Sequence, residues 1–373
     1  MIMKKLLSVI IAIFLICFFA VSAFSFTDEE LELSGANELS EYLSEETLDY
    51  MKKLGCEEIE FEKMLAVSPT AIFELFSELI KKGASAPIRG MMKAAGAVLM
   101  ISVVSGFFPD DEKSKSILNI ACGCFVVVGV ISDAADSVGA AVAAIKSCAV
   151  FEKALIPVLA VILTVGGNPA AALSVKSTAF AAAQVTESLA ENIVLPLFGL
   201  SSSLNICGAV LPTLRLSAVG DIIRKTATTV LATSAGLFSG LLGLKTVLAV
   251  GTDSLAVKGV KMASGTFIPV IGSAIGEIYT SFSASMSLLK TTVGIYAIIA
   301  FAAIGLPIVI NLALWALSMK AASAISDLLD CRQCSELLKN IGFVFSGINT
   351  VLILCMSVFI VTAGVTVLIK NGG

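Results

Sequence analysis

Long runs of apolar residues, separated by short polar links, fill the chain from residue 90 onward. Runs of this length match the roughly 20 residues that an α-helix needs to cross a bilayer. The pattern predicts an all-α fold, a multi-pass transmembrane helical bundle of about 7–9 spans when re-entrant or interfacial segments are counted. The expected spans are 90–108, 117–131, 150–165, 193–211, 226–250, 292–317 and 341–369, with a weaker, alanine-rich run at 170–190. Helix breaks are expected at the Gly-Gly-Asn-Pro stretch 166–169 and, within the span 292–317, at Gly305-Leu306-Pro307.

The segment 262–289 has a mixed pattern. Its apolar residues recur at steps of three and four, as on one face of a helix, while small and polar residues lie off that stripe. Gly272 and Gly276 have the G-x-x-x-G spacing that lets two membrane helices approach closely. A carboxylate in lipid is costly, so Glu277 is expected to face protein or water.

Two interpretations of this segment are open. It lies at the membrane surface with Glu277 solvated, or it lines a pore or cavity with Glu277 bonded to hydroxyl groups one turn away. The second interpretation defines a set of candidate pore or helix-packing residues, which also includes the prolines of other apolar runs. The set is Pro157, Pro269, Gly272, Ser273, Gly276, Glu277, Ser281 and Pro307.

Three short patterns occur twice in the same order. Ile-Pro-Val begins at residues 156 and 268, Leu-Pro at 195 and 306, and Phe-Ser-Gly at 238 and 345. Together they suggest a tandem repeat of about 110 residues, with membrane repeats at 150–250 and 262–369. Matching proline-interrupted helices in two halves are typical of transporters, although such repeats can equally be inert scaffold.

The first quarter of the chain differs from the rest. Residues 1–23 have the lysine-bearing start, apolar centre and small-residue end of a secretory signal peptide. The alternative is an uncleaved anchor, which would still place the following segment outside the cytoplasm. Residues 24–89 carry fifteen acidic and six basic residues, and we expect an acidic extracytoplasmic helical segment there. Two N-terminal membrane helices would follow within 90–149. Because positive links prefer the cytoplasm, the links 212–225 and 320–339 are placed on that side.

Composition narrows the possible chemistry. The chain is 57% apolar, only 14% charged and contains no histidine, so no Ser-His-Asp or H-E-x-x-H site is possible. No phosphate-binding P-loop motif occurs, and no basic cluster is paired with aromatic residues. We therefore expect no enzyme, no cofactor or metal, and no nucleic-acid partner. Cys331 and Cys334 have the spacing of half a redox or zinc site, and their role is open.

Four stretches resemble one family. They are IPVLAVILTVGG at 156–167, ENIVLPL at 191–197, SGTFIPVIG at 264–272 and LLKTTVGI at 288–295. In this order, behind a signal sequence and an acidic segment, they resemble the stage III sporulation protein AE family of endospore-forming bacteria. The resemblance implies a multi-pass protein of the mother-cell or outer forespore membrane. It also implies a channel complex that joins the two cells during engulfment and resembles secretion machinery.

The implied partners are the lipid bilayer and other stage III sporulation membrane proteins, including a separate ATPase and ring-forming subunits. The family has no established catalytic residues, so the resemblance assigns none. Two functions from different classes are thus in view. One is a subunit of a secretion-like channel or export complex that is required for endospore formation. The other is a stand-alone secondary transporter for a small solute or ion, suggested by Glu277 and the repeated broken helices.

Overall fold

A computed structural model describes residues 27–107, 112–210, 216–238, 240–241 and 269–368. Within these ranges the chain is helical and contains no strand. Five helical stretches are long and apolar enough to cross a membrane, which confirms the expected helical membrane protein. These stretches are Pro69–Ser105, Ala135–Val165, Pro169–Gly208, Ala284–Leu328 and Arg332–Val367. The total number of spans and the tandem repeat stay predictions, since residues 242–268 lie outside the described part.

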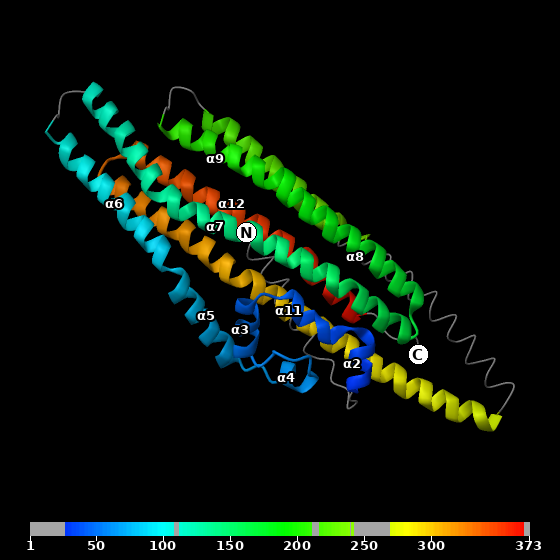
Figure 1. Ribbon diagram of the computed structural model, residues 1–373. Coiled ribbons are helices and arrows are strands. Elements are labelled where there is room, and N and C mark those ends of the chain that lie inside the picture. The colour runs from blue at the N-terminus through cyan, green and yellow to red at the C-terminus, as the bar shows by residue number, and fades with distance from the viewer. Residues whose placement is uncertain (1–26, 108–111, 211–215, 239, 242–268, 369–373) are drawn as a thin grey trace.

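The long helices lie side by side in an elongated bundle (Figure 1). Helices α7, α11 and α12 pack against one another at its centre, α6 covers α7 and α11, α8 packs mainly against α7, and α9 covers α12. The long helices are α5 (Pro69–Gly83), α6 (Ser85–Ser105), α7 (Glu112–Val165), α8 (Pro169–Leu189), α9 (Leu195–Val210), α11 (Pro269–Leu328) and α12 (Arg332–Leu368). Residues 216–238 form a further helix.

Two helices run through places where breaks were expected. Helix α7 has 54 residues, about 80 Å at roughly 1.5 Å per residue, and includes the polar link at 133–146. That link is rich in alanine, a strong helix former. Helix α11 has 60 residues and joins the segment 269–289 to the span at 292–317. The break expected at Gly305-Leu306-Pro307 is wrong, because α11 continues through Pro307 while packed against α7 and α12.

The break expected at 166–169 is confirmed. Gly167 has a φ of 86°, a left-handed conformation that glycine adopts without strain, and Pro169 then occupies the first turn of α8. Helices α8 and α9 are joined by a short π-helix at Ala190–Val194. The expected spans at 170–190 and 193–211 therefore form one nearly continuous rod.

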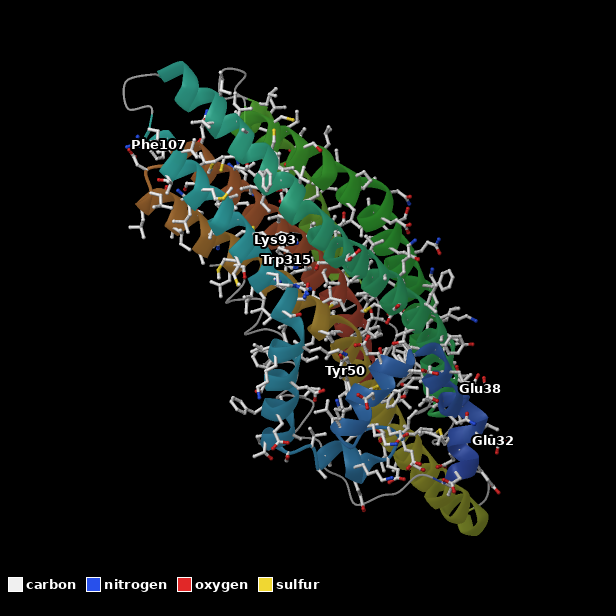
Figure 2. The ribbon with its side chains drawn as sticks, turned by 60° about the vertical axis from the view of Figure 1, so that its left-hand side comes forward. Glu32, Glu38, Tyr50, Lys93, Phe107 and Trp315 are labelled. Carbon is white, nitrogen blue, oxygen red and sulfur yellow. The ribbon has the colours of Figure 1, made fainter. Side chains whose placement is uncertain are left out.

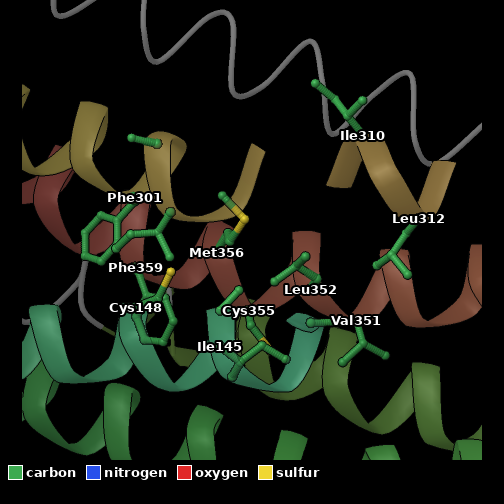
Figure 3. Packing of buried hydrophobic residues seen from close by; sticks show 14 of the residues in the cluster. Ile145, Cys148, Phe301, Ile310, Leu312, Val351, Leu352, Cys355, Met356 and Phe359 are labelled. Atoms are coloured by element: carbon green, nitrogen blue, oxygen red, sulfur yellow. The ribbon is translucent and has the colours of Figure 1, made fainter. Parts of the chain in front are cut away.

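The contact between α11 and α12 forms the apolar centre of the bundle (Figure 3). Phe301 of α11 stacks on Phe359 of α12 with ring centroids 5.6 Å apart, and Phe151 of α7 meets Phe301 edge-on at 5.2 Å. Gly305 lies directly against the side chain of Met356. A β-carbon at Gly305 would overlap the end of that methionine, so the present position of the Met356 side chain depends on a glycine there.

Four helices meet at Trp315, the one tryptophan of the chain (Figure 2). Its ring stacks on Phe345 of α12 at 5.0 Å, and its indole N–H donates a hydrogen bond to Ser137 of α7 over 2.9 Å. A β-carbon added to Gly90 of α6 would lie 2.6 Å from the ring. The buried tryptophan therefore fixes how closely α6 approaches α11.

The N-terminal segment, defined from here on as residues 27–83, packs against α11. It comprises α2 (Asp28–Ser34), η1 (Ala36–Tyr42), α3 (Glu45–Lys53), α4 (Phe61–Leu65) and α5. Ser285 of α11 donates a hydrogen bond to Glu30 over 2.5 Å, and Asn311 of α11 donates one to the Gly83 carbonyl over 3.1 Å. The segment therefore lies beside the apolar middle of α11 rather than beyond its end, as Figures 1 and 2 show.

Candidate functional site

Most of the predicted pore or packing residues lie in the first turns of α11. Pro269 is the first residue of this helix, and Gly272, Ser273, Gly276, Glu277 and Ser281 follow on the same helix. The side chains of residues 269–283 lie outside the described part of the structure. The pore role of these residues therefore stays a prediction.

The structure does place the other two candidates, Pro157 and Pro307. Each lies inside a long helix, α7 for Pro157 and α11 for Pro307. A proline has no N–H, so it cannot bond the carbonyl four residues earlier, here those of Lys153 and Ala303. Each proline lines a cavity that the N-terminal segment covers. The N-terminal segment therefore covers both prolines, although it lies far from them in the sequence.

The cavity at Pro307 is apolar and has a volume of about 520 Å³. One wall is α11, including Ile295, Ile299 and Pro307, and the opposite wall comes from α3, α4 and α5. All its lining side chains are apolar except for the hydroxyl group of Tyr50. A site of this kind can bind hydrocarbon but has few groups that would orient a polar substrate.

The cavity at Pro157 is of similar size, about 500 Å³, but it is partly polar. It lies between η1 and α7, and its lining includes Glu38, Ser34 and Lys153. Lys153 also forms an ion pair with Glu187 of α8 over 2.6 Å. Lys153 therefore belongs both to the lining of this cavity and to the contact between α7 and α8.

A second ion pair crosses the same helix contact. Lys146 of α7 lies 2.7 Å from Glu191, which belongs to the π-helix between α8 and α9. The Lys153–Glu187 pair is the better buried, with its side chains 30% and 20% exposed against 50% and 37% for Lys146 and Glu191. Charged groups inside membrane helices are costly, and pairing reduces that cost. We define these two pairs as the charged seam.

Sequence reasoning missed Glu152, which is fully buried in α7. Its carboxyl group lies beside Thr362 of α12, but that hydroxyl donates to the Val358 carbonyl over 3.0 Å. Among the described residues, neither carboxyl oxygen of Glu152 accepts a hydrogen bond with good geometry. An acidic residue at the start of the expected span 150–165 was the available signal. The sequence alone did not show that it faces the interior.

The structure adds a third cysteine to the Cys331–Cys334 pair. The thiol of Cys122 in α7 interacts with that of Cys334 at the start of α12. Cys331 lies in the turn between α11 and α12, where burial raises the pKa of its thiol. In the described ranges, no group of three or more Cys, Asp or Glu side chains is arranged to hold a metal ion. The contact between the Cys122 and Cys334 thiols joins α7 to α12.

Comparison with known proteins decides the family. The profile of the stage III sporulation protein AE family matches residues 113–370, more than two thirds of the chain. The chain belongs to this family. It is also 24% identical over 279 residues to the stage III sporulation protein AE of Bacillus subtilis (strain 168). This alignment covers 73% of this chain and 70% of the Bacillus protein. No solved structure matches the chain.

The stage III sporulation protein AE match covers α7 to α12 but not the N-terminal segment. It includes Pro157 and Pro307, the charged seam and Glu152. Each cavity therefore has one wall inside the family match and one wall outside it. A sporulation role for the chain follows from its family, whereas the cavities are a finding of the structure.

Proposed function

We propose that the chain is an integral membrane subunit of a secretion-like channel or export complex that is required for endospore formation. In this proposal the complex joins mother cell and forespore during engulfment. The observation that carries it is membership of the stage III sporulation protein AE family over residues 113–370. The chain acts as a structural or gating subunit and not as an enzyme.

The partners belong to the same proposal. They are other stage III sporulation membrane proteins, including ring-forming subunits and a separate ATPase. The chain has no P-loop of its own, so a separate ATPase would supply the energy. The chain sits in the mother-cell or outer forespore membrane, and the N-terminal segment lies outside the cytoplasm once the signal peptide has directed it there.

Within this complex, the beginning of α11 supplies the pore wall or a close helix contact. Gly272 and Gly276 allow a neighbouring helix to approach, and Glu277 places a charge on the polar side of the helix. Glu277→Gln should then keep the protein in the membrane but lower sporulation efficiency at matched protein abundance. Glu336→Gln is the matched control, because Glu336 is exposed on α12. If Glu277→Gln sporulates like the parent, the charge at this position has no function in the pore.

A stand-alone secondary transporter is the second candidate. The observation that favours it is the presence of ionisable groups in candidate spans, the fully buried Glu152 and the partly buried Lys153–Glu187 pair. A transporter of this kind would work without partner subunits. Purified protein in liposomes would then move a solute or ion along a gradient, and Glu152→Gln would reduce that flux.

Affinity purification from sporulating cells separates the two functions. We expect other stage III sporulation membrane proteins to co-purify with the tagged chain in mild detergent, and purified chain in liposomes to show no flux. Recovery of the chain alone, together with flux that Glu152→Gln abolishes, would overturn the channel-subunit proposal. A tagged multi-pass membrane protein of unrelated function, purified in parallel, controls for non-specific recovery.

A further inference from the structure

The apolar cavity at Pro307 lies against a helical stretch that can cross a membrane. Its inner wall is the middle of Ala284–Leu328, and its outer wall includes α5, the charged beginning of the stretch Pro69–Ser105, whose apolar residues follow α5. Its volume of about 520 Å³ is within the roughly 300–1,000 Å³ of pockets that bind small organic ligands. The cavity therefore lies beside a candidate membrane span, where lipid is at hand.

The cavity is open to the exposed face of α5. Ile72 and Phe76 line the cavity and are nevertheless 42% and 41% exposed. Phe73 and Ile80 extend the same exposed apolar surface along α5. Ile72 and Phe76 therefore give the cavity an apolar rim on α5, at which an apolar ligand can enter.

One end of the cavity is polar but carries little net charge of its own. Tyr50 lines the cavity, and the Lys53 and Lys82 ammonium groups lie 5.9 and 5.7 Å from the centre of its ring. Both lysines are already paired, Lys53 with Asp49 and Glu78, and Lys82 with Glu46. Two ammonium groups thus face three carboxylates, which leaves no excess of positive charge to select an anionic headgroup.

The size of the cavity distinguishes between possible occupants. One turn of an α-helix with its side chains, about 10 Å wide and about 5.4 Å long, would fill about 420 Å³. A helix of a partner would therefore insert little more than one turn, and the same limit would apply to any helix from this chain's own residues 1–26. A single acyl chain is much narrower and flexible, and it matches a lining that is apolar throughout apart from one hydroxyl group.

We propose that this cavity binds an acyl chain of a membrane phospholipid and recognises the chain rather than the headgroup. The lipid tail lies between α5 and the α11 residues around Ala302, and the headgroup lies at the Tyr50 end. The N-terminal segment is then held against α11 partly through lipid. This inference does not depend on the channel-subunit proposal.

Photo-crosslinking tests the site in the full-length protein. The protein is reconstituted with phosphatidylcholine or phosphatidylglycerol that carries a diazirine in one acyl chain, irradiated, digested and mapped by mass spectrometry. We expect crosslinks on α5 residues 69–79 and on α11 residues 295–307 with both lipids at similar yield. Ala302→Phe fills the cavity and should reduce these crosslinks several-fold. Ala313→Phe is the matched control, since Ala313 is exposed on α11 outside the cavity, and should leave them unchanged.

Three results would overturn the proposal. One is labelling of residues 69–79 that persists in a folded Ala302→Phe protein, as judged by circular dichroism and gel filtration. Another is labelling of the wild-type cavity that is no stronger than labelling of the exposed face of α6. The α6 face reports ordinary contact with bilayer lipid. The third is a crosslink from the cavity to residues 1–26, introduced with a photoreactive amino acid at position 302, which would assign the site to the chain's own N-terminus. If Ala302→Phe does not fold, the last two comparisons still decide the question.

Discussion

The α11–α12 contact and the α7–α8 contact join neighbouring helices by different means. The first is mainly apolar, with Phe301 stacked on Phe359, Trp315 stacked on Phe345, and Gly305 against Met356. The Asp327–Lys339 ion pair of this contact lies at its exposed end, near the turn between the two helices. The second joins α7 to the alanine-rich helix α8 and to the π-helix that follows it, and it adds the charged seam of Lys146–Glu191 and Lys153–Glu187 to the packing of small side chains. The bundle thus combines one contact between large side chains with one in which ion pairs supplement small side chains.

This difference follows from the side chains available to each helix. Among lipid chains an apolar surface gains little by contacting another apolar surface, so helices associate through close packing or through polar bonds. Helix α12 carries large side chains that fill the space left by the glycines of α11. Helix α8 offers mostly alanine methyl groups, and ion pairs with α7 add attraction that its packing lacks.

The largest loss of stability is expected from a substitution at Trp315. Trp315→Ala would remove the ring that contacts α6, α7 and α12, and we expect a loss of about 3–5 kcal/mol in the free energy of unfolding, as for other buried aromatic truncations. The measurement is unfolding of purified protein in mixed micelles. Leu317→Ala is the control, because Leu317 is 64% exposed and should change stability little. An equal loss in both variants would contradict a shape-dependent contact.

The next effect is expected at the better-buried ion pair. Lys153→Met would leave Glu187 without its partner, at a cost of about 2–3 kcal/mol, between the values for exposed and fully buried pairs. The double variant Lys153→Met, Glu187→Leu should lose less than Lys153→Met alone, because no unpaired charge is left. If the double variant loses as much unfolding free energy as the two single variants together, the two residues do not interact energetically.

A smaller effect is expected at the second pair. Lys146 and Glu191 are 50% and 37% exposed, so Lys146→Met should cost about 0–1 kcal/mol. The same unfolding assay compares this variant directly with Lys153→Met. If both changes cost the same, exposure does not set the strength of the charged seam.

The smallest effect concerns a third contact, between α3 and α5 outside the bundle core. Hydrogen bonds from Lys82 and then from Tyr50 lower the pKa of Glu46 below its usual value. A lowered carboxyl pKa stabilises the folded protein above the pKa of the unfolded state, about 4.3 for glutamate, and this contribution is lost as the pH falls through the folded value. We therefore expect α3 to become more accessible to hydrogen exchange below about pH 4, and Glu46→Gln to reduce that pH dependence. Unchanged pH dependence in Glu46→Gln would assign the effect to other carboxylates.

The sequence by itself determined the helical membrane class and several helix ends. Apolar runs of about 20 residues are typical of membrane helices, because a helix satisfies all backbone hydrogen bonds within lipid. The Gly-Gly-Asn-Pro stretch ends α7 and starts α8 where expected, since Gly167 adopts a left-handed conformation and Pro169 fits the first turn of a helix. These features are local, and local backbone chemistry decides them.

Only the tertiary structure decided which apolar and charged residues face the interior. In a membrane protein both the lipid-facing and the protein-facing sides of a helix are apolar, so periodicity could not distinguish the buried Glu152 from an exposed position. The same limit applies to Pro307, where neighbouring helices hold α11 continuous although its sequence predicts a break. The cavities at Pro157 and Pro307 likewise exist because the N-terminal segment folds back onto α7 and α11. Contacts between residues that lie hundreds of positions apart, such as Glu30 with Ser285, leave no periodic trace in the chain, since they depend on how whole helices pack.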